Sequence, residues 1–217
     1  MILDVDVFLF DFDGTLIAPS IDFNRMYRET FSIIRDFGVY DPVMEQLHIL
    51  EIVERAEARL RPDHGMRREF LKQVHTAILD VELGAAERAE VYLGVPEMLE
   101  ELADRGRGVA IVTRNSRAAV MRILERQALH YDVLLTRDDV AHVKPDPRHL
   151  LEALEHFSET KRCAAMCGDH PMDVLAGKRI GALTVGVLTP DTTEERFAEV
   201  KPDLVVSHPP EILEYID

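Results

Sequence analysis

The chain has 217 residues, with 25 Lys and Arg against 40 Asp and Glu, so its formal net charge is −15 at pH 7. An apolar content of 47% is enough to bury a core, which excludes a disordered or collagen-like chain. The negative charge repels nucleic acid and anionic membrane surfaces at long range, so we expect neither as a partner.

The first predicted strand covers residues 5–10 and ends directly in the sequence DFDGT at residues 11–15. The apolar part of this strand is far shorter than the ~20 residues of a membrane span. Asp4 and Asp6 stand where a secretory signal carries basic residues, so we expect a cytoplasmic protein.

The segment after this strand contains no convincing strand and is predicted to be helical. Amphipathic patterns cover residues 24–37, 43–60, 67–83 and 85–92. We therefore predict a helical cap domain at residues 18–93, inserted into a core domain made of residues 1–17 and 94–217.

The remainder of the chain alternates short apolar runs with helical patterns. Strands are predicted at residues 109–112, 133–135, 164–166, 184–188 and 204–206, and helices are expected to begin near Pro96, Ser116, Pro147, Pro171 and Pro209. This alternation predicts an α/β fold with a parallel sheet flanked by helices. Cys163 and Cys167 lack the second pair that a zinc site needs, so we expect two buried, reduced thiols.

The sequence DFDGT places two carboxylates, Asp11 and Asp13, at the carboxyl end of the first strand. Such a position faces the crevice where open α/β sheets bind ligands. One carboxylate could attack an electrophile and the other could move a proton. If the electrophile is a phosphate, a divalent cation such as Mg²⁺ is needed to offset the repulsion between the carboxylate and the phosphate. Taken alone, the pair could also belong to a solvated turn.

Three further strand ends carry candidate site residues. Thr113, Arg114 and Asn115 precede a helix and could bind a phosphoryl oxygen, although such residues are often only helix caps. Lys144 lies in the sequence VKPDP, where Pro145 holds it extended, and could stabilise negative charge. Asp169 is suited to bind a cation. Asp173, one turn further on, could orient Lys144 or serve as a favourable anion at a helix start.

These sites, in this order, resemble the motifs of the haloacid dehalogenase superfamily, in particular its phosphoglycolate-phosphatase-like branch. The resemblance spans residues 5 to about 190. It implies a Rossmann-like three-layer core and a small α-helical cap domain that closes over the active site.

The resemblance also implies a role for each matching residue. Asp11 would be the nucleophile and Asp13 the general acid and base, while Thr113 and Lys144 would hold the phosphoryl group. Mg²⁺ would be bound by Asp11, Asp169 and the backbone carbonyl of Asp13, with Asp173 in support. Further substrate contacts are implied for Gly14, Arg114 and Asn115. Arg114 and His170 depart from the usual pattern, so their roles stay open.

The implied function is a Mg²⁺-dependent phosphatase that hydrolyses a small phosphorylated metabolite, such as phosphoglycolate, through an aspartyl-phosphate. A sugar phosphomutase shares all four motifs. A carbon–halogen hydrolase is disfavoured by Asp13, and a catalytically silent binding protein is disfavoured because Asp11 and Asp169 are both present. Five cap residues are candidate anion contacts, although each could instead pair with a cap glutamate: Arg25, Arg28, Arg67, Arg68 and His75. The sequence predicts no oligomeric state.

Overall fold

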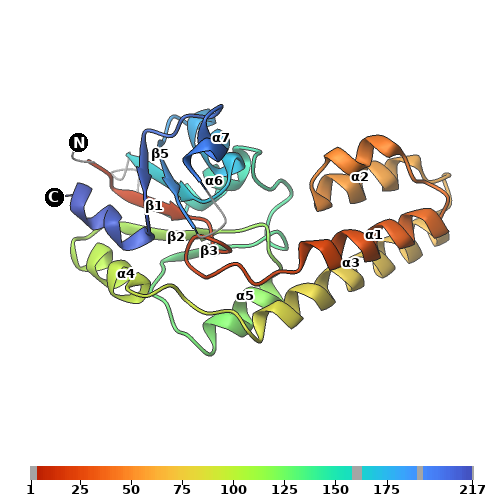
Figure 1. Cartoon of the computed structure of the whole chain (residues 1–217), viewed down its shortest axis with the longest axis horizontal. Coiled ribbons are helices and arrows are strands. Elements are labelled where there is room, and N and C mark those ends of the chain that lie inside the picture. Colours follow the sequence, from red (N-terminus) through yellow and green to blue (C-terminus); the bar gives the residue numbers. More distant parts are fainter. Residues whose placement is uncertain (1–3, 158–162, 190–192, 217) are drawn as a thin grey trace. The chain divides into compact units, whose positions relative to one another are not determined.

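We describe a computed structural model of the chain, in which residues 4–157, 163–189 and 193–216 are placed (Figure 1). The chain forms two compact units. The first consists of Met1–Pro19 and Ala89–Asp217, and the second is Ser20–Arg88.

The first unit is built on a six-stranded parallel sheet with the strand order β3-β2-β1-β4-β5-β6. The strands are β1 (Val7–Phe10), β2 (Gly108–Val112), β3 (Val133–Leu135), β4 (Ala164–Gly168), β5 (Leu183–Val187) and β6 (Leu204–Val206). The predicted α/β fold with a parallel sheet is thus confirmed.

Strand β1 lies in the centre of the sheet, between β2 and β4. Leu9 pairs in register with Ala110 of β2 and with Met166 of β4. All four residues of β1 are buried, because helices cover both faces of a parallel sheet and leave no side of its central strand exposed. The sheet order reverses at β1, and folds of this kind bind ligands beside the carboxyl end of the strand where the order reverses.

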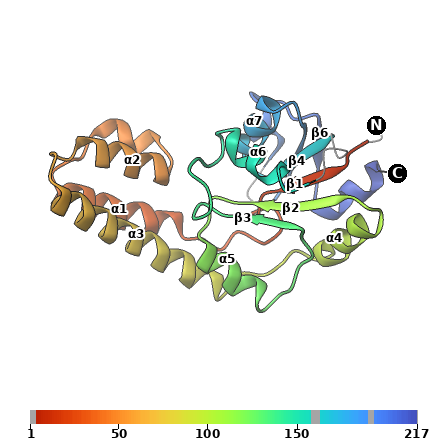
Figure 2. The same cartoon turned by 180° about the vertical axis from the view of Figure 1, so that it is seen from behind.

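Helices form the two outer layers of this unit (Figures 1 and 2). Helices α4 (Val95–Asp104) and α5 (Arg117–Leu124) cover one face, and α6 (Arg148–Leu154) and α7 (Pro171–Arg179) cover the other. Val7 and Leu9 of β1 pack in one apolar cluster with Leu150 of α6 and Ala176 of α7. The described part of the chain also contains the short 3₁₀ helices η1 (Pro42–Gln46), η2 (Glu194–Phe197) and η3 (Pro209–Tyr215).

The second unit is a helical bundle with its own apolar core. Its elements are α1 (Phe23–Asp36), η1, α2 (Ile49–Arg59) and α3 (His64–Ala86). The bundle core is made of apolar side chains from all four elements, including Met26, Ile34, Met44, Ile52, Phe70, Val74 and Ile78. An edge-to-face contact between Phe37 and Phe70, with ring centroids 5.3 Å apart, joins α3 to the residue that follows α1.

Two helix predictions in this unit were wrong. The predicted helix 43–60 is interrupted because Leu47 and His48 are extended, and the Leu47 carbonyl accepts a hydrogen bond from the Tyr27 hydroxyl at 3.4 Å. The predicted helices 67–83 and 85–92 are instead one helix, α3, which continues through Gly84 because Ala85 and Ala86 remain buried. Residues 87–92 are not helical, and Val91 pairs with Ile17 in an isolated bridge.

The expectation of two buried, reduced cysteines holds for one of them. Cys167 is buried in β4, but Cys163, which immediately precedes β4, is exposed. Both thiols are free. In the part of the chain that the structure describes, no helix has the length and apolar content that crossing a bilayer requires.

We expect Phe70→Ala to lower the free energy of unfolding by about 3–5 kcal/mol, because it leaves a cavity in the core of the helical unit. Urea denaturation followed by circular dichroism measures this change. Phe23→Ala is the matched control, since Phe23 is 53% exposed at the start of α1, and it should cost less than about 1 kcal/mol. Equal losses in the two variants would contradict the assigned core.

Candidate active site

The candidate site residues follow the carboxyl ends of neighbouring strands. Asp11 comes directly after β1, Thr113 after β2 and Asp169 after β4. Backbone hydrogen bonds continue the sheet into these positions, since the Asp11 N–H donates to the Cys167 carbonyl at 2.9 Å and the Thr113 N–H to Leu135 at 2.9 Å. Lys144 enters from the loop between β3 and α6. The sheet therefore brings together residues as far apart in the sequence as Asp11 and Asp169, which are 158 positions apart.

Lys144 is the central cation of the site. Its Nζ lies 2.7 Å from Oδ1 of Asp11 and 2.8 Å from Oδ1 of Asp173, and its side chain is only 1% exposed. Burial by itself would lower the pKa of Lys144, but the charges and hydrogen bonds of Asp11 and Asp173 outweigh it and raise that pKa. Lys144 therefore stays charged and holds both carboxylates in place.

Asp169 lacks a comparable counter-charge. Among the described residues, its carboxylate is within ion-pair distance of Arg196 only, where NH1 lies 4.0 Å from Oδ2. Burial, followed by the charges of Asp11 and Asp173, raises the pKa of Asp169 to about 8. Burial also raises the pKa of Asp11, with a further contribution from Asp173. The cluster carries more negative charge than the nearby basic groups neutralise.

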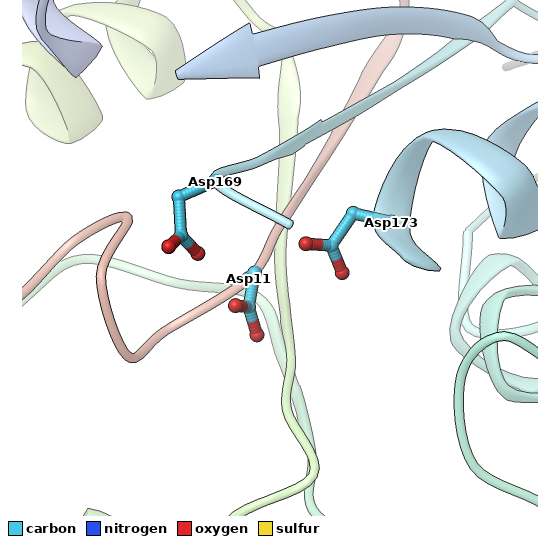
Figure 3. A group of neighbouring side chains, drawn as sticks. All are labelled: Asp11, Asp169 and Asp173. Atoms are coloured by element: carbon cyan, nitrogen blue, oxygen red, sulfur yellow. The ribbon is translucent and has the colours of Figure 1, made fainter. Parts of the chain in front are cut away.

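The three carboxylates fit a divalent cation. Asp11, Asp169 and Asp173 each offer an oxygen, and these oxygens lie within 4.8 Å of one another (Figure 3). Carboxylate oxygens are the ligands that Mg²⁺ prefers. Burial, and then the charges of Asp11 and Asp173, make an ionised Asp169 unfavourable, and a bound cation would offset that cost. Asp173 contributes less freely, because Oδ1 contacts Lys144 and Oδ2 accepts the His170 N–H at 3.2 Å.

Gly14 allows this cluster to be compact. Its φ of +84° lies in the left-handed region, and a Cβ placed there would be 2.6 Å from Oδ2 of Asp169. A side chain at position 14 would therefore strain the backbone and displace Asp169. Thr15 adds to the same arrangement, because its Oγ1 accepts the backbone N–H of Asp169 at 3.0 Å.

Asp13 is held by the residues that follow β2. The Asn115 Nδ2 lies 3.1 and 3.0 Å from the two carboxylate oxygens of Asp13, and the Thr113 hydroxyl donates to Oδ2 at 3.4 Å. Thr113 in turn accepts the Asn115 N–H at 3.0 Å. Both residues thus contact Asp13, and Asn115 directs its amide to that carboxylate.

Arg114 and His170, whose roles the sequence left open, both contact other residues of the site. NH1 of Arg114 donates to the Lys144 carbonyl at 2.8 Å and lies 3.5 Å from the sulfur of Met172. The Nδ1 of His170 accepts the Met172 N–H at 3.1 Å, so His170 caps α7 in the position where Ser or Thr is more usual. Ser116 caps α5 in the same way, at 3.3 Å from the Ala119 N–H.

The five candidate anion contacts in the helical unit are all exposed or half-buried residues of α1 and α3. Arg25 pairs with Glu29 at 2.6 Å, and Arg67 pairs with Glu57 at 2.5 Å. Arg25 and Arg67 thus pair with glutamates of the helical unit, as expected for solvated surface charges. Nothing in the geometry assigns a ligand contact to Arg28, Arg68 or His75.

Sequence reasoning missed Thr15, His149 and Arg196 as neighbours of the site. Thr15 was available as the last residue of DFDGT, where a buried hydroxyl can bind a backbone group. His149 accepts the Lys144 N–H through Nδ1 at 3.2 Å, and its place five residues after Lys144 in an apolar helix pattern was the only signal. No sequence signal pointed to Arg196, because its contact with Asp169 depends on the path of the chain after β5.

Comparison with known proteins agrees with this arrangement. Residues 8–187 match the family model described as "Haloacid dehalogenase-like hydrolase", so the chain belongs to this family of hydrolases. The resemblance seen in the sequence is thus confirmed.

Relatives match almost the whole chain. The pyrophosphatase PpaX of Halalkalibacterium halodurans is 28% identical over 221 residues, covering 99% of this chain and 98% of its own length. That of Listeria monocytogenes is 29% identical and covers 96% and 95%, respectively.

Solved structures share the fold. A hydrolase from Pseudomonas syringae aligns with a TM-score of 0.69 at 19% identity, and covers 97% of both chains. A predicted phosphoglycolate phosphatase from Haemophilus somnus aligns with a TM-score of 0.67 at 21% identity, also over 97% of both. The Rossmann-like core expected from the sequence is confirmed by these likenesses.

The raised pKa of Asp169 predicts how stability depends on pH. Between the usual carboxyl pKa of 3.8 and about 8, the folded metal-free protein binds a proton that the unfolded chain has lost. The free energy of unfolding should therefore fall as pH rises through this interval, by up to about 1.4 kcal/mol per pH unit. Urea denaturation in EDTA at several pH values measures this slope.

Asp169→Asn should make that slope shallower, because the amide does not titrate. Asp146→Asn is the matched control: Arg148 lowers the pKa of that exposed carboxyl, so its titration lies below the interval. An unchanged slope in Asp169→Asn would contradict the assigned electrostatics.

Proposed function

We propose that this protein is a Mg²⁺-dependent phosphatase that works through an aspartyl-phosphate on Asp11. One observation carries the proposal: the buried Lys144 joins Asp11 and Asp173 at 2.7 and 2.8 Å, while Asp169 stands in the same cluster without an equivalent partner. A nucleophile beside a fixed cation and an unsaturated set of oxygen ligands is suited to phosphoryl transfer.

In the first proposed step, a carboxylate oxygen of Asp11 attacks phosphorus and the bond from phosphorus to the leaving oxygen breaks. Asp13 then donates a proton to that oxygen, so the leaving group departs protonated: a phosphate from pyrophosphate, or an alcohol from a phosphate monoester. Asn115 and Thr113 hold the Asp13 carboxylate from the β2 side, which keeps it oriented toward the leaving group.

In the second step, the roles of Asp13 reverse. Asp13 accepts a proton from water, the water oxygen bonds to phosphorus, and the bond between phosphorus and Asp11 breaks. Inorganic phosphate is released and both carboxylates return to their starting forms. Lys144 offsets the negative charge on the Asp11 carboxylate and the phosphoryl group in both steps.

Asp11 and Asp169 would hold the Mg²⁺ through their side chains and Asp13 through its backbone carbonyl, with Asp173 as support. When bound, the ion supplies the positive charge that lets a carboxylate approach an anionic phosphate. This local charge is needed because the chain as a whole carries −15.

We propose inorganic pyrophosphate as the first substrate to test, because full-length relatives are pyrophosphatases. Phosphoglycolate, the expectation from the sequence, is the second. Both are small phosphorylated anions, which agrees with the expected phosphorylated metabolite as partner. We keep the cytoplasmic location as a proposal from the sequence. We also take the helical unit Ser20–Arg88 as the cap that selects the substrate.

Three other functions have less support. A carbon–halogen hydrolase does not need Asp13, yet here two side chains hold that carboxylate. A catalytically silent protein would not need the buried Asp11–Lys144–Asp173 arrangement. A sugar phosphomutase would use the same residues and differs in its product.

We expect Asp11→Asn to reduce turnover by at least about 10³-fold, because an amide is a poor nucleophile toward phosphorus. Phosphate release measures turnover, and circular dichroism checks the fold. Asp104→Asn, an exposed change at the end of α4, is the matched control and should keep full activity. Full activity in Asp11→Asn would remove the nucleophile assignment.

A substrate panel separates the proposed functions. We expect phosphate release from pyrophosphate, from phosphoglycolate or from both in Mg²⁺, and loss of release in EDTA. Activity that persists in EDTA would contradict the role of the cation. Isomerisation of a sugar phosphate without phosphate release would instead identify a mutase.

A further inference from the structure

The backbone of Lys144 is held on both of its polar groups by side chains. Its N–H donates to Nδ1 of His149 at 3.2 Å, and its carbonyl accepts NH1 of Arg114 at 2.8 Å. The next carbonyl, that of Pro145, accepts NH1 of the exposed Arg179 at 2.7 Å. Lys144 is buried, so its backbone groups need hydrogen-bond partners, and here side chains supply them.

His149 is suited to accept a hydrogen bond at this position. It is fully buried in α6, and burial, followed by the charge of Lys144, lowers its pKa to about 3. The imidazole is therefore neutral near pH 7. Because Nδ1 accepts the Lys144 N–H, the ring proton belongs on Nε2.

Arg114 joins three parts of the site. It directly follows Thr113, its guanidinium contacts the Lys144 carbonyl, and the same NH1 lies 3.5 Å from the sulfur of Met172, the neighbour of Asp173. Its own carbonyl accepts NH1 of Arg137 at 3.2 Å, which fixes the backbone of the arginine itself. A displacement of the Lys144 loop would therefore be resisted from β2 and from α6.

This restraint matters because Lys144 must satisfy two carboxylates at once. Its Nζ stands at the end of a long, flexible side chain and meets Asp11 and Asp173 at 2.7 and 2.8 Å. The position of the Lys144 backbone decides whether the ammonium reaches both. A misplacement of about 1 Å is enough to cost about 10²-fold in rate.

We propose that His149 and Arg114 are positioning residues, which hold the Lys144 backbone from its N–H and its carbonyl so that Nζ bridges Asp11 and Asp173. This inference rests on the proposed function. It assigns Arg114 to holding the Lys144 backbone and not to binding substrate, although Arg114 is next in sequence to Thr113, the expected phosphate contact.

The test at position 149 compares two amides. In Asn, Oδ1 takes the place of the imidazole Nδ1 and can accept the Lys144 N–H, whereas Gln places its amide farther out, near Nε2. We expect His149→Gln to lower kcat by about tenfold or more with little change in KM, and His149→Asn to stay within about threefold of wild type.

A packing role predicts the opposite order, because Gln fills the volume of His better than Asn does. A greater loss of kcat in His149→Asn than in His149→Gln would therefore overturn the proposal. His156→Gln is the matched control, since His156 is exposed just after α6 and should leave kcat unchanged.

Arg114→Met keeps the length of the side chain and removes the guanidinium. We expect kcat to fall by about tenfold with KM nearly constant, and Arg114→Lys to recover part of the loss, because an ammonium can still donate to the Lys144 carbonyl. A rise in KM with an unchanged kcat would overturn the proposal and make Arg114 a substrate contact.

One measurement does not depend on activity. The amide of Lys144 should exchange slowly with solvent in the wild type and in His149→Asn, and at least about tenfold faster in His149→Gln, as measured by NMR. Equal exchange in all three proteins overturns the role of His149. If the wild type releases no phosphate but this pattern holds, the proposed function fails while the restraint on Lys144 stands.

Discussion

The contact of the Lys144 ammonium with Asp11 and Asp173 is the interaction on which the rest of the site depends. Removing a lysine from water is unfavourable unless its charge is matched, and here two carboxylates within 2.8 Å supply the match. The same contact sets the direction of the proposed nucleophile. The ion pairs thus join three segments that are distant in sequence. Asp11 follows β1, Lys144 lies in the loop before α6, and Asp173 lies in the first turn of α7.

The basic groups near the cluster do not neutralise all of its carboxylates, and this excess of negative charge makes the cluster suited to bind a cation. Three carboxylates face one buried lysine and a more distant arginine. Burial, and then the charges of the neighbouring carboxylates, raise the pKa values of Asp11 and Asp169. A purely structural ion-pair network would be expected to come closer to neutrality. Excess negative charge next to a crevice at the reversal point of the sheet favours a cation and, through it, an anionic substrate.

Around this cluster, a second set of residues holds the first in place. Asn115 binds Asp13, Thr15 binds the backbone of Asp169, and His149 and Arg114 bind the backbone of Lys144. Their side chains contact the catalytic candidates. Membership of the haloacid dehalogenase-like hydrolases agrees with this arrangement.

The sequence by itself determined the strands that end in DFDGT, TRNS and GDHPMD, because buried strands and helix starts have strong local signals in apolar runs, prolines and glycines. The sequence VKPDP, expected at a strand end, lies instead in the loop between β3 and α6. The sequence alone did not show the break at Leu47 and His48, the exposure of Cys163, or the contacts of Arg114, Asn115 and His149. Those features were decided by the tertiary structure, since they depend on which strands become neighbours and on what packs against each loop. A hydrogen bond between a helix histidine and a loop amide has no local pattern, because it exists only after the sheet has set the strand order.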